Sequence, residues 1–218
     1  MKSSTSTRVM LTVFACLILA ACGREASDTA PAQVGEPMQP TATASESKVS
    51  GPVIRERSSI RFIGANVLLE EHGEFTEFDG SIEYVDGRPA GVHFEIAPGS
   101  ASTGKERLNQ HLRSGDFFES EKYPKATFHS TSIAPAAGAT PDAATHTISG
   151  ELTLKGVTRP VTFPARAELT ADGVHVTSEF RINRHDWNVS YRGAPDNLIR
   201  DDVVIRLDLM FPSPPAAV

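Results

Sequence analysis

Short stretches in which apolar and polar residues alternate run through residues 54–211. The clearest is VVIRLDLMF near the C-terminus, in which Ile205 and Leu207 alternate with Arg206 and Asp208. A period of two places successive side chains on opposite faces of a β-strand, so each such strand is apolar on one face only. About eight of these segments occur, and turn signals such as Asp-Gly separate several of them. The pattern therefore predicts an all-β fold with about eight antiparallel strands.

Eight strands that are each apolar on one face favour a closed, antiparallel β-barrel, because closure leaves no strand edge unpaired. A β-sandwich has the same alternation and stays the alternative architecture. Residues 104–114 break the β pattern, because Leu108 and Leu112 lie four apart and Gly115 can end a helix. Thr103 and Glu106 have the spacing of a capping box. We predict one short helix here that covers a mouth of the barrel.

The N-terminus has the features of an export signal. Two basic residues, Lys2 and Arg8, flank the start of an apolar run that is too short to span a bilayer comfortably. The run ends in LAACG, which resembles the bacterial lipobox, in which the Cys becomes the lipidated first residue. We predict a lipoprotein signal peptide over 1–21 and lipidation of Cys22. A plain signal peptide with a chance Cys is the alternative. By resemblance to lipoprotein sorting rules, Gly23 favours the outer membrane, facing the periplasm of the bacterial cell envelope.

Composition shifts mark the remaining boundaries. Residues 22–53 are rich in Ala, Pro, Ser, Thr and Glu and lack apolar periodicity, so they predict a disordered tether behind the lipidated Cys. The folded domain is then 54–211, and 212–218, with three Pro, is a tail. The formal net charge of −6, with no cluster of Lys or Arg, argues against nucleic acid as a partner.

No group of residues forms a convincing catalytic or metal site. His111 and Asp116 lie five apart, but His129 follows the inward Phe128 and should face outward, so a shared metal ion is not predicted. The run Arg184-His185-Asp186 could hold a base and its carboxylate, yet a turn explains it equally well, and no Gly-x-Ser-x-Gly nucleophile is present. We predict no catalytic residue, no metal and no cofactor, and therefore a binding protein rather than an enzyme.

Large apolar residues occupy the inward phases of the predicted strands. An eight-stranded barrel either fills its lumen with such side chains or holds one small ligand, and the alternation leaves both possibilities open. The strand residues expected to line the lumen are Ile60, Phe62, Phe94, Phe128, Leu152, Phe180 and Leu207. Those from the helix and the segment after it are Leu112, Phe117 and Phe118.

Four motifs together resemble those of the YceI-like family of bacterial exported proteins. In chain order they are SSIRF, HLRSGDFFESEKYPKATFHS, ISGELTLKGVTRPVTFPA and FRINRHDW. The resemblance covers Ser58 to about Phe211. It implies a lipocalin-like barrel that holds a polyisoprenoid or similar long-chain amphiphilic lipid in an apolar tunnel, with no general catalytic activity. Phe117 and Phe118 then become tunnel wall or plug, and the polar residues around them become its rim.

The chain departs from the family pattern in places that could form the tunnel mouth. Arg57 stands where many members carry His, residues 64–73 replace a basic stretch, and Trp187-Asn188 replaces a common Phe-Gly. Two other functions stay open. One is a solid barrel that serves as a structural or protein–protein module of the envelope, and the other is an auxiliary factor in isoprenoid-quinone metabolism. The oligomeric state is not indicated.

Overall fold

The computed structural model describes residues 31–34, 48–136, 143–194 and 197–214. The predicted signal peptide, Cys22, most of the tether and the end of the tail lie outside these residues. Among the helices that the structure describes, none combines the length and the apolar character needed to cross a bilayer.

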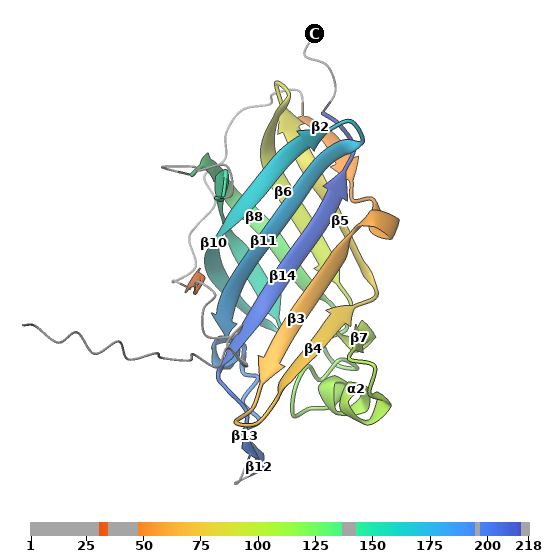
Figure 1. Cartoon of the computed structure of the whole chain (residues 1–218), viewed down its shortest axis with the longest axis vertical. Helices are drawn as coiled ribbons and strands as arrows, with labels where there is room; N and C mark the ends of the chain where they lie inside the picture. Colours follow the sequence, from red (N-terminus) through yellow and green to blue (C-terminus); the bar gives the residue numbers. More distant parts are fainter. Residues whose placement is uncertain (1–30, 35–47, 137–142, 195–196, 215–218) are drawn as a thin grey trace, which may run out of the picture.

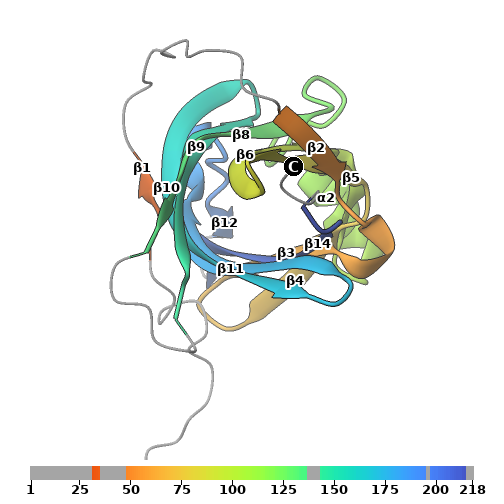
Figure 2. The same cartoon turned by 90° about the horizontal axis from the view of Figure 1, so that it is seen from above.

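One antiparallel sheet of twelve strands makes up most of the described chain, and it curls round an interior (Figures 1 and 2). Eleven strands follow one another across it, and a twelfth, β1 (Gln33–Val34), pairs with β10. The order of the eleven is β2 (Lys48–Pro52), β5 (Phe78–Val85), β6 (Arg88–Ile96), β8 (Ala126–Pro135), β9 (His146–Leu154), β10 (Val157–Thr170), β11 (Gly173–Asn183), β14 (Asp202–Phe211), β3 (Ser59–Ala65), β4 (Glu70–Phe75) and β7 (Ala101–Ser102).

The remaining elements are short. One α-helix, α2 (Glu106–Arg113), lies at the end of the sheet beside β7, and a separate two-stranded hairpin, β12 (Gly193–Ala194) with β13 (Asn197–Leu198), extends from the same end (Figure 1). Three 3-10 helices complete the description: η1 (Arg55–Arg57), η2 (Pro98–Ser100) and η3 (Arg184–Trp187). The prediction of an all-β fold with one helix is confirmed, and a single curled sheet replaces the sandwich alternative.

The strand count differs from the eight predicted. The sheet also contains β1, β2, β4 and β7, four strands that apolar alternation does not mark. Thr76 and Glu77 separate β4 from β5, and η2 separates β6 from β7. Pairing of these additional strands uses backbone groups, so the side-chain pattern does not reveal them. Because β4 and β5 follow each other directly, the two ends of the strand order, β7 beside β4 and β2 beside β5, come together. This gives the sheet its barrel-like form.

Part of the predicted disordered tether is instead ordered. Residues 48–52 form β2, which pairs antiparallel with β5 from Lys48 opposite Val85 to Pro52 opposite Ser81, and Val53 behind it is buried. The prediction for 22–53 is therefore wrong at its end, and it is wrong also at β1, whose residues Gln33 and Val34 pair with Thr162 and Val161 of β10. The physical reason is that pairing along a strand edge uses backbone N–H and C=O groups, which any sequence supplies, so apolar periodicity is not required.

The helix begins two residues later than predicted, and Thr103 does not cap it. The buried side chain of Asn109 reaches back instead, and its Oδ1 accepts hydrogen bonds from the backbone N–H of Thr103 at 2.8 Å and from its hydroxyl at 2.9 Å. Leu112, on the helix, and Phe117, just after it, are buried against Phe62 and Val189. The helix thus packs over one end of the interior, in agreement with the predicted position.

Candidate functional site

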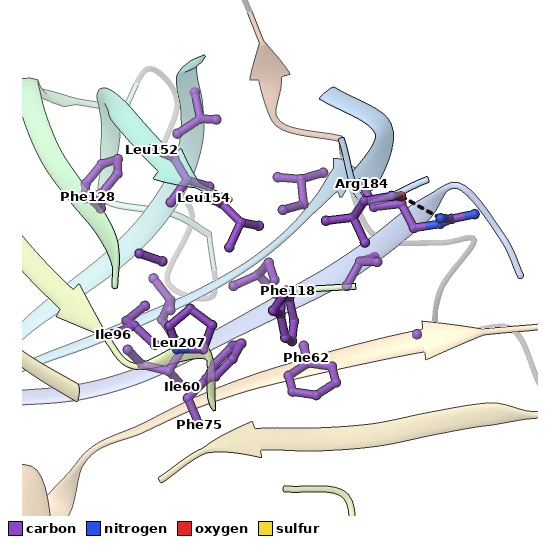
Figure 3. Close-up of a pocket in the computed structure, with 18 of the residues that line it drawn as sticks. Ile60, Phe62, Phe75, Ile96, Phe118, Phe128, Leu152, Leu154, Arg184 and Leu207 are labelled. Carbon is purple, nitrogen blue, oxygen red and sulfur yellow. Dashed lines mark hydrogen bonds between the residues drawn. The ribbon is translucent and has the colours of Figure 1, made fainter. Parts of the chain in front are cut away.

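The interior of the curled sheet contains an apolar cavity of about 200 Å³. Side chains from β3, β6, β8, β9, β10, β11 and β14 converge on it, together with α2 and the segment after it (Figure 3). The ten residues that the sequence singled out all line this cavity: Ile60, Phe62, Phe94, Leu112, Phe117, Phe118, Phe128, Leu152, Phe180 and Leu207. Their positions agree with the inward phases expected, and their role in binding a ligand stays a prediction.

Three of the lining phenylalanines lie over glycines of the neighbouring strand. A Cβ atom on Gly73 would stand 2.3 Å from Cζ of Phe62, and one on Gly150 would stand 2.5 Å from Cζ of Phe128. A Cβ atom on Gly80 would likewise stand 2.4 Å from Cε1 of Phe94. The missing side chains leave room for the rings to lie against the sheet. The rings therefore fill less of the interior than inward-pointing rings would, and space remains for the cavity.

Other lining residues are not among these ten. Phe163 and Ile182 are in the inward phases that strand alternation gives for β10 and β11, and both line the cavity. Val189 and Ile199 come from the irregular stretch between η3 and β14, in which no period marks the inward side chains. Only the tertiary fold brings this stretch across the end of the interior.

A smaller cavity of about 60 Å³ lies next to the first, toward the end of the sheet that carries Phe211. Five side chains line both cavities and so stand between them: Phe94, Phe128, Phe163, Leu207 and Leu209. Among these five, Phe163 makes the closest aromatic contacts, because its ring stacks on Phe180 at 4.2 Å and lies 5.6 Å from the ring of Phe128.

Aromatic contacts close the end of the cavity beneath α2. The ring of Phe75 lies 5.2 Å from that of Phe62 and 5.8 Å from that of Phe118. On the other side, the Tyr191 ring contacts the ring of His111 at 4.8 Å and that of Phe117 at 5.4 Å. These contacts join the helix to the stretch after η3, so two segments far apart in sequence form one rim.

Arg184 is the one charged residue among the described side chains that line the cavity, and it is 5% exposed. Its guanidinium donates to three backbone carbonyls, those of Val189 at 2.6 Å, Arg200 at 3.0 Å and Ile199 at 3.4 Å. Burial lowers the pKa of Arg184, and Asp201, at 3.7 Å, opposes this effect. These donors fix the backbone at residues 189, 199 and 200 beside the cavity, and Figure 3 shows Arg184 among the side chains that line it.

The histidines considered for chemistry occur in separate pairs. His111 Nε2 lies 2.9 Å from Asp116 Oδ2, and His185 Nε2 lies 2.8 Å from Asp201 Oδ1 rather than beside Asp186. Among the residues that the structure describes, no three His, Cys, Asp or Glu side chains come close enough together to hold a metal ion.

His129 faces outward, as its strand phase predicted, and its Nδ1 lies 3.1 Å from Nδ1 of His93 on the adjacent strand. Burial, and secondly the neighbouring His93, lower the pKa of His129, although Glu151 acts in the opposite direction. The pair lies on the outer face of the sheet, whereas Phe94 and Phe128, the next residues along each strand, line the cavity. It therefore has no direct access to a molecule held inside.

The sequence profile of the YceI-like domain matches residues 52–211. Among curated proteins, Protein YceI from Escherichia coli O17:K52:H18 is 40% identical over 97 residues, which make up 44% of this chain and 48% of that protein. A UPF0312 protein from Pseudomonas aeruginosa is 41% identical over 97 residues, again 44% of this chain and 48% of that protein. These alignments thus span about half the length of the curated relatives.

Two solved structures resemble the fold. BcnA from Burkholderia cenocepacia has a TM-score of 0.63 at 24% identity, over 72% of this chain and 98% of that one. A polyisoprenoid binding domain from Saccharophagus degradans, implicated in plant cell wall breakdown, has a TM-score of 0.59 at 20% identity, over 76% of this chain and 98% of that one. At these identities the likeness is one of fold alone.

Proposed function

This chain belongs to the YceI-like domain family, and on that premise we propose that it binds a polyisoprenoid or a similar long-chain amphiphilic lipid inside its curled sheet, without catalysing a reaction. The observation that carries the proposal is the apolar cavity that the ten predicted residues line. A fold neighbour described as a polyisoprenoid binding domain supports the same class of ligand.

The size of the cavity favours occupancy by a ligand over a solid interior. An engineered cavity of about 150 Å³ with a Leu, Ile and Phe lining stays dry and takes up benzene. An apolar ligand in such a space gains stability by leaving water, because each buried methylene contributes about 0.8 kcal/mol.

The chemistry of the lining selects the ligand class. The lining side chains offer no hydrogen-bonding group except Arg184, and its guanidinium already donates to three carbonyls. A charged or sugar-like molecule would lose its hydration without gaining partners inside. A branched hydrocarbon chain has no polar groups whose hydration is lost. The polar headgroup of such a lipid would remain at the rim near Tyr191 and His111.

We extend the proposal to the arrangement of the strands and to the location of the protein. If β4 with β5, and β6 with β7, each count as one bent strand, eight strands surround the cavity: β3, β4–β5, β6–β7, β8, β9, β10, β11 and β14. For the location, we propose that acyl chains on Cys22 hold the domain at the envelope, on the outer membrane facing the periplasm. The LAACG motif supports this anchor.

The test is organic extraction of the purified full chain, followed by mass spectrometry of the extract and thermal unfolding with added polyisoprenol. We expect a stoichiometric isoprenoid of about C30–C50 and a rise in Tm when the emptied protein is given polyisoprenol. A clean extract, together with no rise in Tm for any isoprenoid or fatty lipid, would refute the proposal and favour a solid structural module.

A further inference from the structure

Three consecutive aliphatic side chains stand exposed at the turn between β3 and β4. Val67 is 66% exposed, Leu68 is 75% exposed and Leu69 is 61% exposed. Leu198 on β13, 51% exposed, belongs to the hairpin that neighbours this turn, since Asn66 forms an isolated bridge with Ile199. We call these four residues the apolar tip. In Figure 1 this turn lies at the end of the sheet that carries α2 and β13.

The apolar tip is continuous with the rim of the cavity. Gly64, three residues before Val67, lines the cavity, and so does Ile199, the residue after Leu198. The backbone N–H of Arg200 donates to the carbonyl of Ala65 at 2.8 Å, which holds the two segments together. On both segments, therefore, the apolar tip lies within three residues of the cavity lining.

The backbone of the turn is prepared for an environment without water. Oδ1 of Asn66 accepts hydrogen bonds from the N–H groups of Leu68 at 2.9 Å and Leu69 at 2.7 Å. The N–H of Asn66 in turn donates to the carbonyl of Leu69 at 2.9 Å. Unpaired backbone groups are what makes a loop expensive to bury in hydrocarbon, and three of the groups in this turn already have partners inside it.

The size and the charge of the apolar tip favour a bilayer over a protein as its partner. A stable protein–protein interface buries about 800 Å² on each side, much more than four aliphatic side chains offer, whereas a bilayer accepts a narrow wedge. On one flank, Glu71 forms an ion pair with Lys105 at 2.6 Å, and Glu70 lies beside it; the other flank carries Arg200. With both signs of charge present, electrostatic attraction to anionic lipids is not the driving force.

We propose that the apolar tip inserts into the interfacial region of a lipid bilayer and places the end of the cavity that α2 covers against the membrane. The purpose of this contact, exchange of an apolar molecule between bilayer and cavity, rests on the proposed function. The contact itself does not, because it depends only on the exposed side chains and the three paired backbone N–H groups of the turn.

A fluorescent label at the tip tests the docking directly. The full chain carries Leu68→Cys in a background of Cys16→Ser and Cys22→Ser, and the new thiol is labelled with a polarity-sensitive nitrobenzoxadiazole dye. The matched control is Leu169→Cys, because Leu169 is 71% exposed and lies on β10 near the β10–β11 turn, at the opposite end of the sheet. The signal is local, so it does not depend on how the N-terminus attaches to the vesicle.

With phosphatidylcholine vesicles we expect a blue shift at position 68, unchanged by raising the salt concentration, and quenching by lipids that carry a spin label at a shallow depth of about 5–10 Å. The label at position 169 should show neither effect. Equal signals at both positions, or none at position 68, would overturn the proposal. A shift that requires envelope vesicles containing proteins would overturn it too, because the partner would then be a protein.

A second measurement separates this proposal from the proposed function. Val67→Ser, Leu68→Ser and Leu69→Ser together should slow the uptake of polyisoprenol from vesicles at least tenfold, whereas Leu169→Ser leaves the rate unchanged. If the label reports insertion but no isoprenoid is ever taken up, the docking stands and the proposed function falls. If uptake proceeds at the same rate in the triple variant and in wild type, the proposed purpose of the contact, exchange between bilayer and cavity, falls and the binding function stands.

Discussion

Phe163→Ala is the substitution that most clearly separates a ligand-holding interior from a solid one. The Phe163 side chain is 5% exposed, stacks on Phe180 at 4.2 Å and lines both cavities. Its removal joins the 200 Å³ and 60 Å³ spaces and adds the volume of the ring. For the emptied protein we expect the free energy of unfolding to fall by about 3–5 kcal/mol, the usual loss for a buried Phe→Ala. For a domain of this size, that is roughly 6–20 °C in Tm.

Added polyisoprenol should then restore part of the loss. A ligand present at one hundred times its Kd stabilises the folded state by about 2.7 kcal/mol. Because the joined cavity is longer, the variant should prefer a longer chain than the wild type does. The assay is thermal unfolding of both proteins, first emptied by extraction and then supplied with isoprenols of increasing length.

The matched control is Phe78→Ala. Phe78 is 7% exposed and belongs to the same core cluster, but it lines neither of the two cavities. It should lose stability to a similar extent, and its ligand preference should stay that of the wild type. Two results together would refute a ligand-holding interior. In the first, the wild type gains no stability from any isoprenol. In the second, added lipid restores no more stability to Phe163→Ala than to Phe78→Ala.

Three further predictions follow from other parts of the chain. Cys22→Ser in a background of Val67→Ser, Leu68→Ser and Leu69→Ser should release the domain from membranes without lowering its Tm relative to that background, as fractionation and unfolding of the released protein would measure; a variant that stays membrane-bound would contradict the anchor. Arg184→Gln should lower the free energy of unfolding by about 2–5 kcal/mol in chemical denaturation, since buried carbonyls lose charged donors, and no loss would mean that the guanidinium does not hold the stretch 189–200. The lowered pKa of His129 means that the unfolded chain binds this proton more readily. The free energy of unfolding of the wild type should therefore fall as the pH drops below the ordinary His value of 6.5. In His129→Gln it should fall less steeply with pH, and the ligand content should stay unchanged. Equal pH slopes in the two proteins would contradict this prediction.

The sequence by itself determined the fold class and ten residues of the cavity wall. Alternation with a period of two is a local property of the strand backbone, so it assigned Ile60, Phe128 and Leu207 to the inside without any knowledge of how the strands pair. The Leu pair of the helix and the two Phe after it were assigned to the covering segment for a similar reason. Four motifs in register also sufficed to identify the family.

Only the tertiary structure decided the features that depend on pairing between distant segments. The additional strands β4 and β7, and the pairing of residues 48–52 with β5, depend on backbone hydrogen bonds that leave no mark in side-chain periodicity. The stretch around Val189 and Ile199 has no period, so its place across the end of the interior follows from the carbonyls that Arg184 holds. The volume of the cavity is likewise a property of packing. It arises because rings such as Phe62 lie over glycines on the next strand, and the pairing register sets that juxtaposition.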